Sequence, residues 1–341
     1  MALGLREQSV ERREFLTGFA STATVVCPLV AYAQQPERVR RIGVLMGYGE
    51  SDPEGKALLS TFAQRLAELG WIDGRSVRMD VRWGAGSVDR MRMMAKELVD
   101  LQPDAIFAHT TAATAALHRE TLTIPIVFVN VSDPVGPGFV ASVPHPGGNI
   151  TGFIYAEASM GGKWVELLTD FAPGIKRIAI MFNPDTAPGG GNYFLGSFEA
   201  GTRSLGRDAA TLRVHNDTEI ETEMTSLGSE PRAGLVVMPD SFMEVHRAPI
   251  ISLAARNNVP AIYYDPRFVK DGGLISYGPN IQDFYRRAAP YVDRILRGER
   301  PADLPVQLAV KFDMVVNAKT AMALGLAVPP SIMARTDEVI E

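Results

Sequence analysis

Short apolar strands alternate with helices of roughly ten to fifteen residues along most of the chain, and this pattern constrains the fold more than any other feature. Each expected strand is a short apolar or β-branched run that ends at turn-forming residues. In the first part of the chain, strands are expected at 41–46, 77–83, 104–109 and 124–131, with helices at 58–69, at 91–101 and from Thr110. Such alternation predicts a parallel sheet that is covered by helices on both faces.

The same alternation resumes later in the chain. Strands are expected at 177–182, 211–215, 235–238 and 261–264, with helices at 162–171, 194–205 and 218–227 and another ending at Asn257. The two parts share an architecture but no clear sequence repeat. The sequence therefore predicts an α/β protein with two Rossmann-like lobes, each a parallel sheet flanked by helices.

The segment from Ile124 to Phe153 separates the two alternating parts. It begins as a buried strand, but residues 133–149 contain four prolines and four glycines. These residues fix or free the backbone φ angle and forbid a long helix or a central strand. We interpret this segment as the place where the chain leaves one lobe for the other, beside a cleft that binds a ligand.

The C-terminal section predicts a return to the first lobe. A strand is expected at 274–277, an amphipathic helix at 281–296, a strand at 310–316 and a helix at 318–324. The boundaries expected for the first lobe are 38–153 plus 275–306, and those for the second lobe are 154–274 plus 307–341.

Residues 1–33 have the pattern of a cleaved export signal. Arg12 and Arg13 precede an apolar stretch at 19–32, which ends in Ala31-Tyr32-Ala33. Paired arginines before Phe-Leu resemble the twin-arginine type. A membrane anchor is the alternative, although about fourteen apolar residues are too short to span a bilayer. Cleavage after Ala33 would also remove Cys27, leave a soluble chain without cysteine and keep the net charge of -5.

Composition and motifs argue against several classes of function. A mild net negative charge does not fit a general nucleic-acid binder, which needs a basic patch. Gly189-Gly190-Gly191 is not followed by the Lys-Ser/Thr of a phosphate loop, the five histidines lack metal-ligand spacing, and no G-x-S-x-G is present. Two distant acids could still converge in a cleft. We nevertheless predict no catalytic residue, metal or cofactor.

Polar residues follow several of the expected strands, where ligands bind in open α/β sheets. His109, Thr110, Thr111 and Ala112 open a helix, whose free N–H groups favour an anion such as a carboxylate. The alternative is an ordinary threonine cap without a ligand. The other candidates are Tyr48, Glu50, Ser51, Ser132, Asp133, Tyr155, Asn183, Asp240, Ser241, Asp265 and Tyr277. Aspartates before helices can equally be caps, and strand-end tyrosines can equally belong to the core.

Two long motifs carry a family resemblance. They are DPVGPGFVASVPHPGGNITG at 133–152 and NAKTAMALGL at 317–326, with shorter matches over nearly the whole chain after residue 40. The chain resembles ABC-transporter substrate-binding proteins of the tryptophan/tyrosine type, which have the type I periplasmic binding-protein fold. His109-Thr110 stands where this family usually has a Gly-Thr-like turn, which changes the donor set of the expected carboxylate site.

The resemblance implies a monomeric periplasmic protein whose lobes are joined by several crossovers and close on a small ligand. That ligand would be an amino acid or a related aromatic or carboxylate compound, delivered to a membrane permease that a separate ATPase drives. Closing excludes water and needs no covalent step. Two alternatives remain open, namely a sensory module that presents the closed form to a membrane receptor and a hydrolase or isomerase on the same scaffold.

Overall fold

The computed structural model describes residues 38–341. The expected export signal, including Cys27 and the cleavage site after Ala33, lies outside the described residues. Within the described residues, no helix is both long and apolar enough to cross a membrane.

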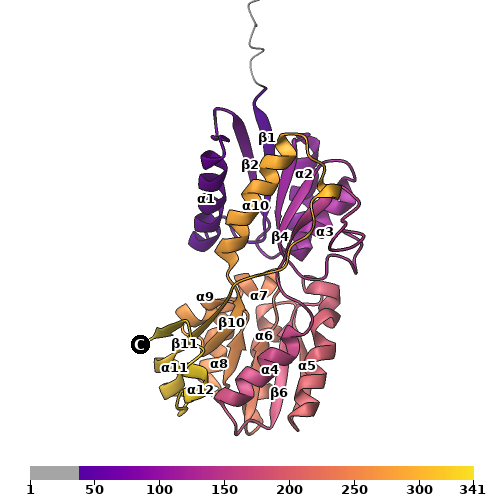
Figure 1. Ribbon diagram of the computed structural model, residues 1–341. Helices are drawn as coiled ribbons and strands as arrows, with labels where there is room; N and C mark the ends of the chain where they lie inside the picture. The colour runs from indigo at the N-terminus through magenta and orange to yellow at the C-terminus, as the bar shows by residue number, and fades with distance from the viewer. Residues whose placement is uncertain (1–37) are drawn as a thin grey trace, which may run out of the picture. The chain divides into compact units, whose positions relative to one another are not determined.

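The first sheet has five parallel strands in the order β2-β1-β3-β4-β5. Its strands β1, β2 and β4 are labelled in Figure 1. Its strands are β1 (Arg40–Met46), β2 (Val77–Trp83), β3 (Ala105–His109), β4 (Ile126–Val131) and β5 (Ile150–Ile154). Every residue of β3 and β5 is buried, as expected for strands that helices cover on both faces. The expected strands of the first part are thus all present, and β5 extends the sheet beyond them.

The second sheet has seven strands in the order β12-β11-β10-β9-β8-β6-β7. They are β6 (Arg177–Phe182), β7 (Asp208–Arg213), β8 (Ala233–Val237), β9 (Ala261–Tyr263), β10 (Ile275–Pro279), β11 (Phe312–Asn317) and β12 (Glu338–Ile340). All neighbours are parallel except β10 and β11. After β10 the chain visits the first sheet and returns from that side, so β11 re-enters at the end where β10 left and runs antiparallel to it.

The first five strands of each sheet are arranged in the same order. The series 2-1-3-4-5 describes β1 to β5 and equally β6 to β10. In such sheets the connections diverge to opposite faces between the first and third strands, and ligands bind outside the carboxyl ends of those strands. The topology therefore predicts a binding site among the residues at the carboxyl ends of β1, β3, β6 and β8.

Helices cover both sheets, and α10 lies in sequence between β10 and β11 of the second sheet but packs on the first. The first part contains α1 (Pro53–Glu68), α2 (Val88–Asp100) and α3 (Thr111–Glu120). The second contains α4 (Met160–Phe171), η1 (Pro188–Gly191), α5 (Asn192–Ser204), α6 (Asp217–Ser229), α7 (Ser241–Val245), α8 (Arg247–Arg256) and α9 (Pro266–Lys270). The last are α10 (Ile281–Leu296), η2 (Pro301–Asp303), α11 (Ala318–Ala323) and α12 (Pro330–Met333). In Figure 1, α10 lies beside α1, and it packs against β3, β4 and β5.

The chain crosses between the sheets three times, after β5, after β10 and in the segment before β11. Gln307 of the last crossing pairs with β5, since its carbonyl accepts from Ile154 N at 2.8 Å and its N–H donates to Gly152 O at 2.9 Å. Residues 275–279 form β10 in the second sheet, whereas the sequence pattern had placed them in the first lobe. Ile275 and Ser276 pair with β9, so the return to the first sheet begins at α10.

Candidate functional site

Tyr48 follows β1 and His109 is the last residue of β3, and the two form an aromatic pair at the carboxyl ends of these strands. Their rings stack with centroids 4.7 Å apart and planes 9° apart, and both side chains are fully buried. Gly47 N donates to His109 Nδ1 at 3.3 Å. A Cβ at Gly47 would lie 2.7 Å from Thr110 Cγ2, so this close approach requires glycine.

His109 is an uncharged residue in this site. Burial, together with the positive charge of Arg267, lowers its pKa from 6.5 to about 3. The imidazole is therefore neutral at physiological pH, and it serves as a hydrogen-bonding and stacking group. It does not add positive charge to the anion site that the sequence suggested at this turn.

The start of α3 has the threonine cap that the sequence offered as the alternative to an anion site. Thr110 Oγ1 accepts from Ala113 N at 3.3 Å, and this N–H group is thereby satisfied. Thr110 has φ 92°, and Asn130 and Asp133 at the end of β4 have φ 56° and 50°. Such angles are rare for residues other than glycine, and strain of this kind gathers at functional sites.

Asp240 caps α7 at the carboxyl end of β8 in the second sheet. Its side chain accepts from Met243 N at 2.7 Å, Asn183 N at 3.0 Å and Thr186 Oγ1 at 3.2 Å. Burial raises its pKa to about 7 against the effect of these donors. The aspartate thus holds the loops after β6 and β8 together.

Arg267, Asp265 and Glu244 form a buried ionic cluster on the second sheet's side of the site. Arg267 donates to both carboxylate oxygens of Asp265, at 2.7 and 3.0 Å, and lies 3.5 Å from Glu244 Oε1. Its guanidinium also covers the Tyr48 ring at 4.9 Å from the centroid. Burial raises the pKa of Glu244 to about 7, although Arg267 opposes this rise.

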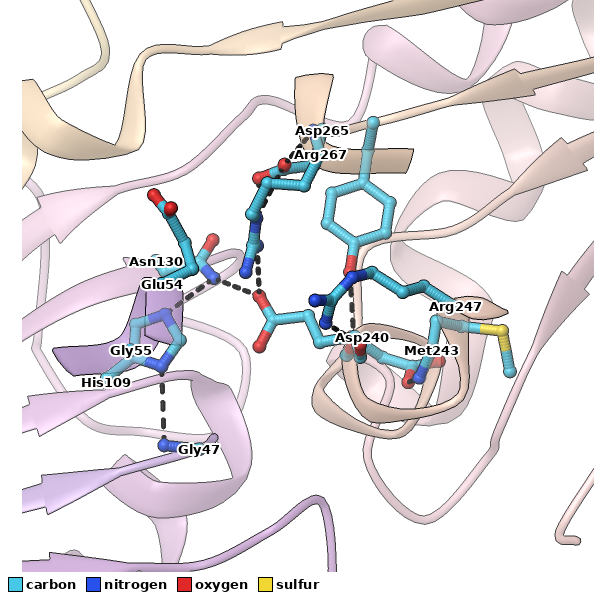
Figure 2. Close-up of polar contacts among 12 residues, drawn as sticks. Gly47, Glu54, Gly55, His109, Asn130, Asp240, Met243, Arg247, Asp265 and Arg267 are labelled. Atoms are coloured by element: carbon cyan, nitrogen blue, oxygen red, sulfur yellow. Dashed lines mark hydrogen bonds and ion pairs between the residues drawn. The ribbon is translucent and has the colours of Figure 1, made fainter. Parts of the chain in front are cut away.

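Asn130 joins the two sides of the site. Its Nδ2 lies 3.1 Å from His109 Nε2 and 3.1 Å from Glu244 Oε1. Figure 2 shows this contact with His109 and the further contact from His109 to Gly47. A second link is the ion pair between Arg247 Nη1 and Asp52 Oδ2 at 3.2 Å.

Several polar atoms of this site are buried without a partner. Among the described residues, nine buried side-chain polar atoms have no hydrogen-bond partner, and four of them belong to this site. They are Tyr48 Oη, Ser241 Oγ, Glu244 Oε2 and Arg267 Nη1. Buried polar groups are normally hydrogen-bonded, so their concentration in one place indicates a surface that receives a polar ligand.

The cavity that Ser241 lines is small. A cavity of about 10 Å³ is lined by Thr110, Thr111, Asn130, Ser132, Thr186, Pro188, Pro239, Asp240 and Ser241. This volume is enough for about one water molecule, so a larger ligand enters only if the lobes move apart. A second pocket, of about 390 Å³, is lined by Arg267 and other residues of α9, by residues of α1, and by residues 279–282, 311 and 313.

The structure brings together many of the residues that the sequence suggested. Tyr48, His109, Thr110, Thr111, Ser132, Asp240 and Ser241 lie in the cluster or line its cavity, Asn183 contacts Asp240, and Asp265 holds Arg267. Tyr155 and Tyr264, which lie side by side, interact edge to face, and Tyr155 Oη donates to Tyr264 O.

Other suggested residues lie apart from the cluster. Glu50 and Ser51 are exposed, Asp133 accepts from Gly136 N within its own turn, and Tyr277 stacks on Phe312. Ala112 lies in the first turn of α3 and is half-buried. These five side chains have the more ordinary roles of surface, turn and packing residues in this arrangement.

Three central residues were missed by sequence reasoning. Asn130 is the only polar residue of the strand Ile126–Val131, and that signal could have identified it. Glu244 and Arg267 lie inside short helices, four residues after the cap Asp240 and two residues after the cap Asp265, respectively. Charged residues on helices are usually exposed, so nothing local distinguished them. Among residues 38–341, no cluster of His, Cys, Asp or Glu could hold a metal ion.

Two α/β lobes with matching strand orders and a polar site between the carboxyl ends of their strands define a binding protein of the type I periplasmic fold. The family model for "ABC transporter substrate binding protein" matches residues 51–340. The chain therefore belongs to the ABC transporter substrate-binding protein family.

Known relatives agree with this assignment. The chain is 24% identical over 266 residues to a "Tyrosine-binding protein" of Clostridioides difficile strain R20291, which covers 78% of this chain and 75% of the relative. It is 25% identical to an ABC domain from Streptococcus pneumonia solved in complex with L-Trp, with a TM-score of 0.81 and coverage of 88% of this chain and 99% of the other.

A third relative allows a comparison between an open, ligand-free structure and the L-Trp complex. The ligand-free, open structure of a substrate-binding protein with adhesive properties from Clostridium difficile is also 25% identical, with 89% of this chain and 99% of the other covered, but its TM-score is 0.63. At equal identity and similar coverage, residues 38–341 thus match the L-Trp complex better than the open structure.

Proposed function

We propose that this protein binds a zwitterionic amino acid with an aromatic side chain, tryptophan or tyrosine, between its two lobes. The observation that carries this proposal is the set of four unpartnered buried atoms on Tyr48, Ser241, Glu244 and Arg267. The set contains a cationic donor, an anionic acceptor and two hydroxyl groups, which is the complement of an α-carboxylate and an α-ammonium group.

Each charge of the ligand then has a specific partner. Arg267 Nη1 donates to the ligand carboxylate, and Glu244 Oε2 accepts from the ligand ammonium. Both protein charges are buried, and a buried charge that lacks a partner is costly. An amino acid supplies both partners at once, and the aromatic rings of Tyr48 and His109 provide a wall against which an aromatic side chain can pack. The ligands named for the two relatives at 24% and 25% identity support this choice.

We further propose that the protein serves an importer. The ligand binds when the lobes are apart, closure adds contacts from the second lobe, and the closed form is presented to a membrane permease that a separate ATPase drives. Membership of the substrate-binding family supports this role, and the twin-arginine-like pattern at residues 1–33 supports a periplasmic location.

A thermal-shift screen tests the ligand class, because a ligand that binds only the native state raises the melting temperature. The screen contains the twenty amino acids, their aromatic deaminated analogues and neutral sugars. We expect the largest shift with L-tryptophan or L-tyrosine. A shift with neutral sugars and none with any amino acid would contradict the proposal.

Ser241→Ala tests the position of the ligand. Loss of a hydroxyl that contacts the ligand should weaken binding by about tenfold, the equivalent of one hydrogen bond to a charged group. Ser229→Ala is the matched control, since Ser229 is an exposed serine of the same lobe and should leave the dissociation constant unchanged. Equal affinity of the two variants, measured by calorimetry, would place the ligand elsewhere.

A further inference from the structure

The hydrogen bonds around His109 determine which ring nitrogen carries its proton. Gly47 N is a donor only, and it lies 3.3 Å from His109 Nδ1, so Nδ1 must accept. A neutral imidazole has one N–H group, which is then on Nε2. His109 therefore donates from Nε2 toward Asn130, whose amide atom lies 3.1 Å away.

The identity of that amide atom decides the protonation state of Glu244. If it is Nδ2, two donors face each other across 3.1 Å. If it is Oδ1, it accepts from His109, because the two orientations of an amide differ only in the exchange of oxygen and nitrogen. The same atom also lies 3.1 Å from Glu244 Oε1, and two acceptors can share this contact only if Glu244 carries a proton and donates.

The charges around Glu244 agree with a neutral carboxylic acid. Arg267 is the cation that faces it from α9, and this guanidinium already forms two bonds with Asp265. Asp52 at the start of α1 adds negative charge, and Asp240 at the start of α7 does so when it is ionised. Arg247 pairs with Asp52 and Asp271. His109 and Tyr48, which face the cluster from the first lobe, are uncharged, so acidic groups outnumber the guanidinium groups.

We propose that Glu244 selects ligands by charge, because it takes up a proton when the lobes close without an amine and remains ionised when a ligand ammonium lies beside it. The proton comes from solvent and bonds to a carboxylate oxygen of Glu244. An ammonium group at Oε2 supplies the positive charge instead, so no proton is then needed. This inference rests on the proposed function, and it adds a specificity-determining role for one residue.

Proton counting by calorimetry tests the inference. The full-length mature protein is titrated at pH 6 with L-tryptophan and with indole-3-propionate, or with L-tyrosine and 3-(4-hydroxyphenyl)propionate, in buffers of low and high ionisation enthalpy. The deaminated analogue should bind with uptake of about one proton, and the amino acid with uptake near zero. Opening would expose Glu244, so we expect its pKa to return toward the ordinary 4.5 in the open form. In the closed form burial raises its pKa to about 7, and pH 6 lies between the two values.

The pH dependence provides a second readout. Affinity for the deaminated analogue should fall by up to tenfold per pH unit between about pH 5 and pH 7, while affinity for the amino acid changes little. Glu244→Gln should abolish both the proton uptake and the pH dependence, and should reduce the preference for the amino acid over its analogue by tenfold or more. Glu221→Gln, an exposed carboxylate of the same lobe, should keep the wild-type behaviour.

The outcomes distinguish this inference from the proposed function. If the amino acid binds and its analogue takes up no proton, or if Glu244→Gln retains the uptake, the role of Glu244 is wrong and the ligand assignment stands. If no amino acid binds the wild type, the proposed function itself is wrong, and the role of Glu244 is overturned with it.

Discussion

The two faces of the site differ in charge. To the cluster around His109 the first lobe contributes Tyr48, His109, Thr110 and Asn130, which are aromatic or polar and uncharged. Its carboxylate Asp52 is only partly buried and pairs with Arg247 of the second lobe. The buried charged side chains of the cluster all come from the second lobe. They are Asp240, Glu244, Asp265 and Arg267. The two lobes share a strand order, so this difference arises from the loops and short helices that follow equivalent strands.

This difference indicates that the two lobes bind different parts of the ligand. A charged group is recognised best by fixed opposite charges, whereas an aromatic group is recognised by stacking and shape. We therefore expect the second lobe to hold the ligand's charged groups and the first lobe to contact its side chain. Substitutions on the two faces should then have different effects on affinity, stability and pH dependence.

Arg267→Met is the substitution with the largest expected effect. It leaves Asp265 and Glu244 buried without their guanidinium partner, and breaking a buried ion pair in this way costs about 3–5 kcal/mol. We expect a lower free energy of unfolding and a loss of at least a hundredfold in amino-acid affinity, as measured by chemical denaturation and calorimetry.

Arg335→Met is the matched control for that change. Arg335 pairs with Asp170 at 3.3 Å on the surface of the second lobe, where an ion pair contributes about 0–1 kcal/mol. It should leave the dissociation constant unaltered. A similar loss of affinity in both variants would mean that Arg267 has no special position in the site.

Gly47→Ala tests the uncharged face of the first lobe. The added Cβ would lie 2.7 Å from Thr110 Cγ2 and 3.2 Å from His109 Nδ1, so the loop after β1 must shift. Overpacking of this kind costs about 1–3 kcal/mol. Gly49→Ala is the control two residues away, because no atom lies within 4 Å of its added Cβ. Comparable melting temperatures for the two variants would show that the Tyr48 loop is loosely packed.

The fold was predictable from the sequence to a large extent. Strands and helices leave a local periodic signal, so the expected strand from 41 to 46 closely matches β1 and the one from 177 to 182 matches β6. The antiparallel direction of β11 left no such signal. It depends on the route of the chain through the first lobe, which involves residues far apart in sequence.

The site was predictable only where a loop begins. Polar residues at or just beyond the carboxyl ends of strands, such as His109 and Asp240, are recognisable because topology places them at a common edge. Glu244 and Arg267 have roles that depend on contacts with Asn130 and Asp265 across or within the lobes. From sequence alone, a charged residue on a helix is predicted to be exposed, and only its contacts in the folded protein show otherwise.

Opposite pH dependences give the subtlest test of the difference between the faces. His109 has a pKa of about 3 in the native protein and 6.5 ordinarily, so between these values the unfolded chain binds more protons and the free energy of unfolding rises with pH. Glu244 has a pKa of about 7 in place of 4.5, so the native protein binds more protons and the free energy falls as pH rises. Each slope is at most about 1.4 kcal/mol per pH unit.

Denaturation of two variants between pH 5.0 and pH 6.5, with the lobes held closed by a saturating deaminated analogue, separates these contributions. Relative to the wild type, His109→Gln removes the rising component and should make the slope of unfolding free energy against pH more negative. Glu244→Gln removes a falling component and should make the slope more positive, while Asp240, whose pKa is also raised to about 7, continues to contribute in both variants. Because the two substitutions act on opposite faces with opposite signs, slopes that change in the same direction would refute the division into an uncharged first lobe and a charged second lobe.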